Sequence, residues 1–543
     1  MLSVGFIYRC ESFTGRIQRK GDVVIREGGE VPLPPHGLLR LPPVFTPYTD
    51  TGAGRSRPSE KERHQPKSNN IITGGSMSNG KRHFLDLFFH PGSLAIVGVS
   101  RNPSSPNFHL VSNLVKLKFP GKVYPVNPNA EELAGLKAYP DLKSIEGDID
   151  LAIISVPANQ VPDIVRDCIA KKVKAVSIIT GGFSETGDNG KGLQGEILNL
   201  LRENGIRAIG PNALSPVNTA NNFIISFSSI EKMTRGTLSF IFQSGLYDPM
   251  LNWFFSDRNL NISKLIDLGN KMDISEVDAL EYLAQDPETK VIAMHLESIA
   301  GDARKFMRLL KDTTKEKPVI VLKSGRTAAG AKAASSHTGA IIKSSDAVFD
   351  VALKQSGAIR AQGLDEFFDL AKIFEYLSPL KNNRIAIATG SGGEGVITTD
   401  CSQLNGFTLA ELNPETRSNL RSIYPPWDIP PNPLDTGVCG QFNKEIDVNS
   451  AFLDILVDDL NVDCFVMRVS GGSRTGQNQF VKSSSEVIKK GKHIATWVID
   501  PVKERPVIDE VESNRVPVYP SPERAVRALA ALYQYHNNKA TGI

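Results

Sequence analysis

From Ser93 onward the sequence alternates between short apolar runs and amphipathic stretches, and this alternation restricts the possible folds more than any other feature. The first apolar runs are SLAIVGVS, KVYPVNP, DLAIISVP, KAVSIITGG and IRAIGPN. The segments NQVPDIVRDCIAKK and KGLQGEILNLLRENG between them have helical spacing. Buried strands that alternate with helices predict a parallel, doubly wound sheet.

The same pattern begins again twice. A second set of runs, LSFIFQSG, KLIDLGN, KVIAMHLES and PVIVLKSG, extends to about residue 378, and a third contains RIAIATGSGG, DCFVMRVSGG and HIATWVID. We therefore predict an α/β protein with three Rossmann-like or flavodoxin-like parallel-sheet domains in series. The Pro-rich stretch YPPWDIPPNPLD within the third set is expected to form a surface loop.

Residues 1 to about 80 differ from the rest of the chain. They are rich in Pro, Gly, Ser, Arg and Lys and lack sustained periodicity, which predicts a disordered extension. Met77 then opens MSNGKRHFLDLFFHPGSLAIVGVS, a natural start for a folded domain. Our hypothesis is that the native product begins at Met77, and the intact mass of natively expressed protein tests it.

Composition and charge exclude several classes of protein. The net charge of +3 and the absence of a basic block give no sign of nucleic-acid binding. No run of about 18 apolar residues predicts a membrane span, and the N-terminus does not resemble a signal peptide. Five scattered cysteines without CxxC spacing favour a reducing, cytoplasmic setting and no zinc or other metal site.

The turn after the first apolar run has the composition of a phosphate-binding turn. It reads Gly98-Val99-Ser100-Arg101-Asn102-Pro103, so its backbone N–H groups could meet a phosphate. GxGxxG is absent, and the next strand ends in VNPN without an acidic residue for a ribose, which argues against NAD. A purely structural turn is the alternative. Small or polar groups at the other strand ends, SVP, TGG and GPN, favour a ligand site there.

A single histidine, His337, lies in the small-residue segment TAAGAKAASSHTGA, which we expect to be a mobile loop. Imidazole is nucleophilic near neutral pH and can carry a covalent intermediate. A phosphohistidine would need helix N-termini to receive its charge, and the turns FQSG at 242–245 and TGSGGEG at 389–395 are candidates. Glu297 could hold the second ring nitrogen. The alternatives are a solvated surface histidine and a surface carboxylate.

An ordered set of longer motifs shows a family resemblance. AIVGVSRNP, ITGGFSETG, GPNALSPVN, LGNKMDISEVDALEYL, KSGR…AASSHTGA, GSGGEGV, NPLD and PVYPSPERAVRALAAL follow one another from about residue 84 to 535. This segment resembles the α subunit of ADP-forming acetyl-CoA synthetases, in the succinyl-CoA synthetase superfamily. The resemblance implies a CoA-binding domain at 84–225, a ligase domain with a phosphohistidine at 226–378, and a flavodoxin-like domain at 379–543.

The resemblance also implies roles for individual residues. His337 matches the phosphorylated histidine and Glu297 the carboxylate that steadies it. Ser244, Gly245, Gly392 and Gly393 match the two helix N-termini around the phosphate. Residues that match the CoA site are Gly98, Ser100, Arg101, Asn102, Val126, Asn127, Ser155, Val156, Pro157, Thr180 and Glu185.

The implied activity is the reversible, ATP-dependent formation of acyl-CoA from a carboxylic acid and CoA. The phosphoryl group would pass between an acyl phosphate, His337, and ADP. We expect an ATP-grasp β subunit to bind Mg-ATP or Mg-ADP, in a complex with two copies of each chain.

Departures from the family pattern keep other functions open. Phe242 stands where a serine is common, Asn129 where a basic residue is common, and AIIKSSD after the histidine is bulkier than usual. The main alternative is a non-catalytic module that senses CoA or acyl-CoA. An NAD-type oxidoreductase and a Ser–His hydrolase are weaker alternatives, the latter because no GxSxG motif is present.

Overall fold

The computed structural model describes residues 83–214, 216–247, 257–338, 345–470 and 474–541. They belong to one compact unit that spans Asn79–Ile543. The predictions of a disordered extension over residues 1–80 and of a native start at Met77 lie outside the described residues.

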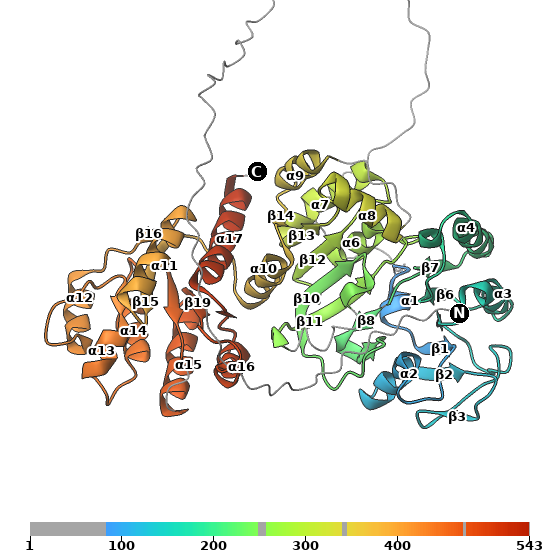
Figure 1. The fold of residues 1–543 in the computed structure, drawn as a ribbon, viewed down its shortest axis with the longest axis horizontal. Coiled ribbons are helices and arrows are strands. Elements are labelled where there is room, and N and C mark those ends of the chain that lie inside the picture. Colours follow the sequence, from blue (N-terminus) through green and yellow to red (C-terminus); the bar gives the residue numbers. More distant parts are fainter. Residues whose placement is uncertain (1–82, 215, 248–256, 339–344, 471–473, 542–543) are drawn as a thin grey trace, which may run out of the picture. The chain divides into compact units, whose positions relative to one another are not determined.

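The first sheet has five parallel strands in the order β2-β1-β5-β6-β7, which confirms the five strands predicted there. A small antiparallel pair, β3 and β4, follows β2. Figure 1 shows α3 and α4 beside β6 and β7. The elements are α1 Asp86–Phe89, β1 Ser93–Val97, α2 Pro106–Lys116, β2 Lys122–Val126, β3 Glu132–Leu133, β4 Leu136–Lys137, β5 Leu151–Ile154, η1 Ala158–Gln160, α3 Val161–Ala170, β6 Ala175–Ile178, η2 Ser184–Thr186, α4 Asp188–Glu203 and β7 Arg207–Ile209.

The second sheet has the order β14-β13-β12-β10-β11-β8-β9. Five strands are parallel, and the short hairpin β8–β9 adds antiparallel strands at the β11 edge. The elements are β8 Val217–Asn218, η3 Thr219–Asn221, β9 Phe223–Ile224, β10 Arg235–Phe242, η4 Gly245–Tyr247, β11 Ile262–Asp267, α6 Glu276–Gln285, β12 Val291–Leu296, α7 Ala303–Glu316, β13 Val319–Lys323, α8 Ala328–Thr338, α9 Asp346–Gln355, β14 Ile359–Ala361 and α10 Leu364–Tyr376.

The third sheet has the parallel order β16-β15-β18-β19-β20, and β17 also pairs with β15. The elements are β15 Arg384–Thr389, α11 Gly392–Leu404, β16 Thr408–Leu409, α12 Pro414–Leu420, η5 Arg421–Ile423, β17 Leu434–Asp435, α13 Thr436–Phe442, α14 Val448–Leu456, β18 Cys464–Arg468, α15 Arg474–Lys489, β19 His493–Trp497, α16 Arg505–Ser513, β20 Val518–Tyr519 and α17 Pro522–Thr541.

The three sheets share one strand order. Numbered along the chain, the five main parallel strands of each sheet lie as 2-1-3-4-5. The chain direction across the sheet therefore reverses between the first and third strands: β1 and β5, β10 and β12, β15 and β18. In open α/β sheets ligands bind at such switch points, outside the carboxyl ends of the strands. The fold thus marks three places where function can be sought.

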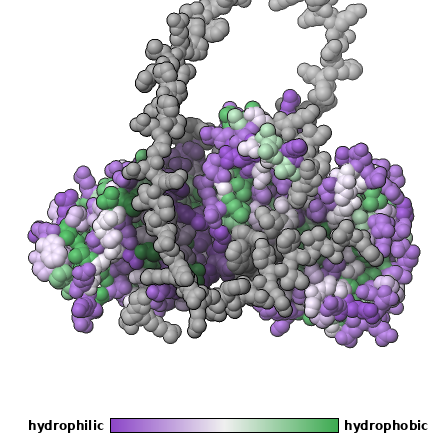
Figure 2. Space-filling view, in the orientation of Figure 1, coloured by the Kyte–Doolittle hydropathy of each residue, from purple (hydrophilic) through white to green (hydrophobic). Residues whose placement is uncertain are grey.

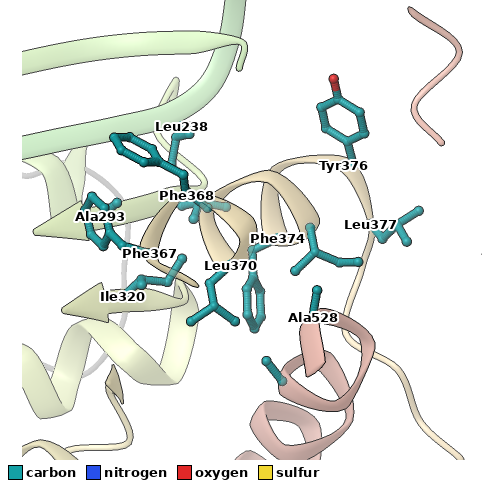
Figure 3. Close-up of a cluster of buried hydrophobic side chains, with 14 of the residues drawn as sticks. Leu238, Ala293, Ile320, Phe367, Phe368, Leu370, Phe374, Tyr376, Leu377 and Ala528 are labelled. Carbon is teal, nitrogen blue, oxygen red and sulfur yellow. The ribbon is translucent and has the colours of Figure 1, made fainter. Parts of the chain in front are cut away.

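Helix α10 joins the cores of the second and third sheets. Phe367 and Phe368 pack with Leu238 and Ala293 of the second sheet, whereas Phe374 lies near Ala528 of α17 (Figure 3). All residues of α10 from Phe367 to Tyr376 are buried. Three of them are charged, and each has a partner on the C-terminal side of the chain: Asp369 with Arg524, Lys372 with Glu512, and Glu375 with Arg515.

Two local predictions were wrong. The segment around His337 is not a loop, because residues 328–338 form helix α8. Alanine has the highest helix propensity, and Thr327 Oγ1 accepts a hydrogen bond from Gly330 N (3.0 Å) at the start of the helix. The Pro-rich stretch is also not entirely a surface loop. Its last residues form β17, and Asn432 donates to the carbonyls of Ile385 and Ala410 inside the sheet.

Hydrophilic residues predominate on the visible face of the described part, with hydrophobic residues in smaller areas between them (Figure 2). None of the helices in the described ranges has both the length and the apolar character needed to cross a membrane.

The buried pair of Lys372 and Glu512 gives a prediction about stability. Their charged atoms lie 2.6 Å apart, and the side chains are 10% and 0% exposed. Lys372→Met should lower the free energy of unfolding by about 3–5 kcal/mol, because it leaves the Glu512 charge buried without its cation. Urea unfolding followed by circular dichroism measures this.

Two further variants make that test specific. The double variant Lys372→Met, Glu512→Leu should recover most of the loss, because no buried charge remains. Lys315→Met removes one partner of an exposed pair, whose side chains are 61% and 70% exposed, and should hardly change the unfolding midpoint. Equal losses for Lys372→Met and Lys315→Met would contradict the explanation.

Candidate functional site

At the first switch point, the turn after β1 lies directly against the end of β5. Gly98 has φ +94°, and a Cβ at this position would lie 2.3 Å from the carbonyl oxygen of Ser155. Only glycine fits here, because φ is positive and the backbone of the turn touches the backbone at the end of β5. Gly98 and Ser155, predicted separately, therefore lie side by side.

Asn107 holds these two turns together. Its Nδ2 lies within hydrogen-bond distance of Gly98 O (3.2 Å), Ser155 O (3.3 Å) and Ser155 Oγ (3.0 Å). Asn107 is not among the residues predicted from the sequence. Its position just after a proline, at the start of a helix that follows the first strand, is the signal that could have identified it.

The neighbouring end of β2 is fixed by side chains from the predicted set. Asn127 Nδ2 donates to Val99 O (2.7 Å), and Asn127 Oδ1 accepts from Asn129 N (2.8 Å). Arg101 donates from Nη1 to Asn129 O (3.1 Å). The turn after β1 is thus tied to β2 on one side and to β5 on the other. Among the other predicted residues, Ser100 Oγ accepts from Asn102 N (3.1 Å), Val126 is buried, and Pro157 precedes η1.

The end of β6 adds two predicted residues to this edge. Thr180 Oγ1 donates to Val156 O (2.6 Å). Glu185, in η2, accepts from Gly182 N (2.6 Å) and from Asn270 Nδ2 (2.6 Å). Burial opposes ionisation of Glu185, but these hydrogen bonds outweigh it and lower the pKa of its carboxyl group. Asn270 follows β11, so this contact joins the first and second sheets.

Helix α8, which carries His337, contacts η2. The side chain of His337 lies outside the described residues, as does segment 339–344 that follows it. The helix nevertheless lies beside Glu185 at the carboxyl edge of the first sheet.

At the second switch point, Gln243 joins the end of β10 to the end of β12. Its Oε1 accepts from the backbone N–H groups of Glu297 (2.8 Å) and Ser298 (3.0 Å), and its Nε2 donates to Ser298 Oγ (3.1 Å). Gln243 is 2% exposed. Gln243 is not among the predicted site residues, although it directly precedes the predicted Ser244 and Gly245. Ser244 directly precedes the 3₁₀ turn η4, which begins at Gly245, and residues 248–256 beyond this turn are not described.

Glu297 is 6% exposed, so the alternative that it is a surface carboxylate was wrong. Lys323, the last residue of β13, donates from Nζ to Glu297 O (2.7 Å), at the end of the neighbouring strand β12. Burial lowers the pKa of Lys323, and the carboxylates of Asp346 and Glu297 oppose that shift. Lys323 is also not among the residues predicted from the sequence. It precedes the turn that leads into α8, so this lysine connects the strand end that carries Glu297 to the segment that leads to His337.

At the third switch point, Gly392 and Gly393 form the first turn of α11, as predicted for a helix N-terminus. Both are exposed. Ser391 caps the helix by accepting from Glu394 N (3.4 Å). An exposed, capped N-terminus with two glycines can place backbone N–H groups on an anion. No group of three or more potential metal ligands occurs among the residues described.

A buried histidine, His295, lies on β12 of the second sheet, two residues before Glu297. His295 Nδ1 lies 2.8 Å from Tyr247 Oη, and its Nε2 lies 2.5 Å from Ser324 Oγ. Burial, with a smaller contribution from the Lys323 charge, lowers the pKa of His295 to about 4. His295 is therefore neutral near pH 7 in the folded protein.

This pKa predicts how stability changes with pH. Between pH 6.5 and 4 the unfolded chain takes up a proton at His295 that the folded chain does not, so stability falls as pH falls. From pH 7 to 4.5 this group alone should remove about 2 kcal/mol. His295→Gln should lose that part of the pH dependence in urea unfolding. The explanation fails if the wild type and the variant lose the same amount.

Three family models match the chain in order along its length. The model described as CoA binding domain matches residues 92–218, the succinyl-CoA ligase like flavodoxin domain matches 235–374, and the Ligase-CoA domain matches 385–490. The residues of the first switch point lie inside the first match, those of the second inside the second, and α11 inside the third.

Curated relatives cover most of the chain. Acetate–CoA ligase [ADP-forming] II subunit alpha of Pyrococcus furiosus is 36% identical over 464 residues, which are 84% of this chain and 99% of the relative. Acetate–CoA ligase [ADP-forming] II of Archaeoglobus fulgidus is 34% identical, and the match covers 83% of this chain and 66% of that longer relative.

A solved structure agrees with these matches. The dinucleotide forming acetyl-coenzyme A synthetase 1 of Ca. Korarchaeum cryptofilum, in complex with phosphate and ADP, aligns with a TM-score of 0.75 at 31% identity. The alignment covers 84% of this chain and 97% of that one. Together the ordered family models, the nearly complete match to an α subunit and the shared fold show that this chain belongs to the family of ADP-forming acetate–CoA ligase α subunits.

Proposed function

We propose that this chain binds CoA and carries a phosphoryl group on His337 in an ADP-forming acyl-CoA synthetase. The overall reaction is carboxylate + CoA + ATP = acyl-CoA + ADP + phosphate, and it is reversible. The observation that carries the proposal is the position of α8. The helix that bears His337 contacts η2 of the CoA-binding unit, and it follows the strand whose Lys323 donates to Glu297.

The first switch point is the proposed CoA site. Gly98, Ser100, Arg101 and Asn102 form the turn proposed to meet the phosphates of CoA, and Arg101 adds a cation. Asn107 and Asn127 hold this turn in place, so it need not reorganise on binding. The remaining predicted residues, Val126, Ser155, Val156, Pro157, Thr180 and Glu185, line the adjoining strand ends.

His337 is the proposed nucleophile. Its imidazole accepts the phosphoryl group of ATP as ADP leaves, and the substrate carboxylate then takes this group to give an acyl phosphate. The CoA thiol attacks the acyl carbon and phosphate leaves. Glu297 is proposed to hold the second ring nitrogen of His337, and the turns at Ser244–Gly245 and Gly392–Gly393 to bind the phosphoryl oxygens.

A partner subunit is proposed to bind Mg-ATP. The chain covers nearly all of a relative named as an alpha subunit, but only 66% of a relative without that designation. We propose that an ATP-grasp β subunit corresponds to the rest, in a complex with two copies of each chain.

The non-catalytic alternative depended partly on Phe242, which replaces a common serine. The Phe242 ring is fully buried and stacks on Tyr247, with ring centroids 3.7 Å apart. The substitution therefore fills the core and does not obstruct the turn at Ser244. This favours the catalytic function.

Labelling with γ-³²P-ATP tests the role of His337. The chain, reconstituted with its partner and Mg²⁺, should acquire acid-labile label, and His337→Ala should acquire none. Glu297→Gln should slow labelling by roughly 100-fold, because the imidazole loses its orienting carboxylate. His109→Ala, on α2, is the matched control and should label normally. Tight CoA binding without label in the wild type would instead favour the sensing module.

The turn at Gly98 gives a separate prediction for CoA. Gly98→Ala should weaken CoA binding at least about tenfold, because the new Cβ meets the Ser155 carbonyl and the backbone must move. Gly205→Ala is matched to it: φ is also positive, at +67°, but a Cβ there meets nothing within 4 Å. Calorimetric titration with CoA should show Gly205→Ala close to the wild type. Equal affinities for both variants would place CoA elsewhere.

A further inference from the structure

The third sheet carries a polar pocket at its switch point. It has a volume of about 330 Å³ and lies at the carboxyl ends of β15, β17 and β18. Gly390, Lys444, Asn449 and Arg468 are among its lining residues. The volume is at the lower end of the range of about 300–1,000 Å³ found for small-molecule sites. None of the roles proposed above uses these four residues.

Arg468, at the end of β18, is the central side chain of this pocket. Its Nη1 donates to Glu394 Oε1 (3.0 Å), and Glu394 Oε2 accepts from Gly390 N (2.8 Å). The Arg468 side chain is 27% exposed, so part of it is open to the pocket. Glu394 lies in the first turn of α11, so Arg468 is linked directly to the helix N-terminus proposed to receive the phosphoryl group.

The backbone is shaped to admit this arginine. A Cβ at Gly390 would lie 2.2 Å from Arg468 Nη1 and 3.2 Å from its Cδ. A Cβ at Gly437 would lie 2.0 Å from Gly390 O. Two glycines are thus needed for the guanidinium to lie over the end of β15 while α13 begins beside it.

The pocket also contains polar groups that the described protein leaves unsatisfied. Arg468 Nε and Asn449 Oδ1 are buried and have no hydrogen-bond partner within the described ranges. Such atoms are rare in native structures, and an unseen water or ligand commonly explains them. Lys444, exposed, has no ion-pair partner there either, whereas Asp447 is engaged in capping α14. The pocket therefore presents two cations and a donor–acceptor pair, and it suits a ligand rich in oxygen.

We propose that this pocket binds the distal carboxylate of a dicarboxylic acid substrate through Arg468 and Lys444. The inference rests on the proposed function, because it places the reacting carboxylate of the same acid at the first turn of α11. A guanidinium recognises a carboxylate by parallel hydrogen bonds that an ammonium cannot reproduce. The preferred acid of this chain is therefore a short dicarboxylate, not an acid with an apolar tail.

The test compares glutarate with valerate, in which a methyl group replaces the second carboxylate. Calorimetric titration of the full chain should show glutarate binding at least about tenfold more tightly. Arg468→Lys keeps the charge beside Glu394 but loses the planar fork, and Gly390→Ala displaces the arginine. Each should weaken glutarate binding about tenfold and change valerate binding less than about twofold. Arg421→Lys, an exposed arginine beside Asp428, is the matched control.

The outcomes separate this proposal from the proposed function. Equal binding of the two acids, or undiminished glutarate binding in Arg468→Lys, overturns the substrate assignment. Loss of His337 label in Arg468→Lys without any acid present also overturns it, because Arg468 would then act on the phosphoryl group. If the wild type shows no label but Arg468→Lys still loses glutarate binding, the pocket stands and the proposed function fails. CoA titration of each variant confirms that the chain has folded.

Discussion

The structure depends on one constraint: parallel sheets buried on both faces can expose functional groups only at their strand ends. Each sheet has the same 2-1-3-4-5 order, so each has one place where neighbouring helices leave the sheet in opposite directions. A polar side chain crosses that place in all three sheets. Asn107 spans the first, Gln243 the second and Arg468 the third. Each joins the ends of adjacent strands and fixes the turn beside it.

Contacts between the first and second sheets connect two of these edges. Asn270, after a strand of the second sheet, donates to Glu185 of the first. Helix α8, which carries His337, follows a strand of the second sheet and contacts η2 at the edge of the first sheet. Helix α10 is buried against the cores of the second and third sheets, and its three buried charges all have ion-pair partners. Ion pairs of this kind add little net stability, but they penalise any alternative packing that would separate them.

The three polar edges differ in what they can recognise. The first carries Arg101 and is the proposed CoA site. The second holds the buried carboxylate of Glu297, whose charge opposes the lowering of the pKa of Lys271 and Lys323 by burial. The third offers an arginine held by Glu394. A single reaction can use all three if CoA, the phosphoryl carrier and the acid each occupy one edge. The specificity of each edge would then depend on a few side chains, because the strand order of the three sheets is the same.

The sequence by itself determined the class of fold, the position of the main strands and the strand-end residues, because period, turn chemistry and ordered motifs are local properties. It did not determine that Asn107, Gln243 and Lys323 hold the site together, since each bridges strands that are distant along the chain. It also predicted a loop around His337, although alanine-rich residues there form α8. Burial, which decided that Glu297 is not a surface carboxylate, is likewise a property of packing. Tertiary structure alone sets such contacts, because they exist only when separate strands meet at one edge.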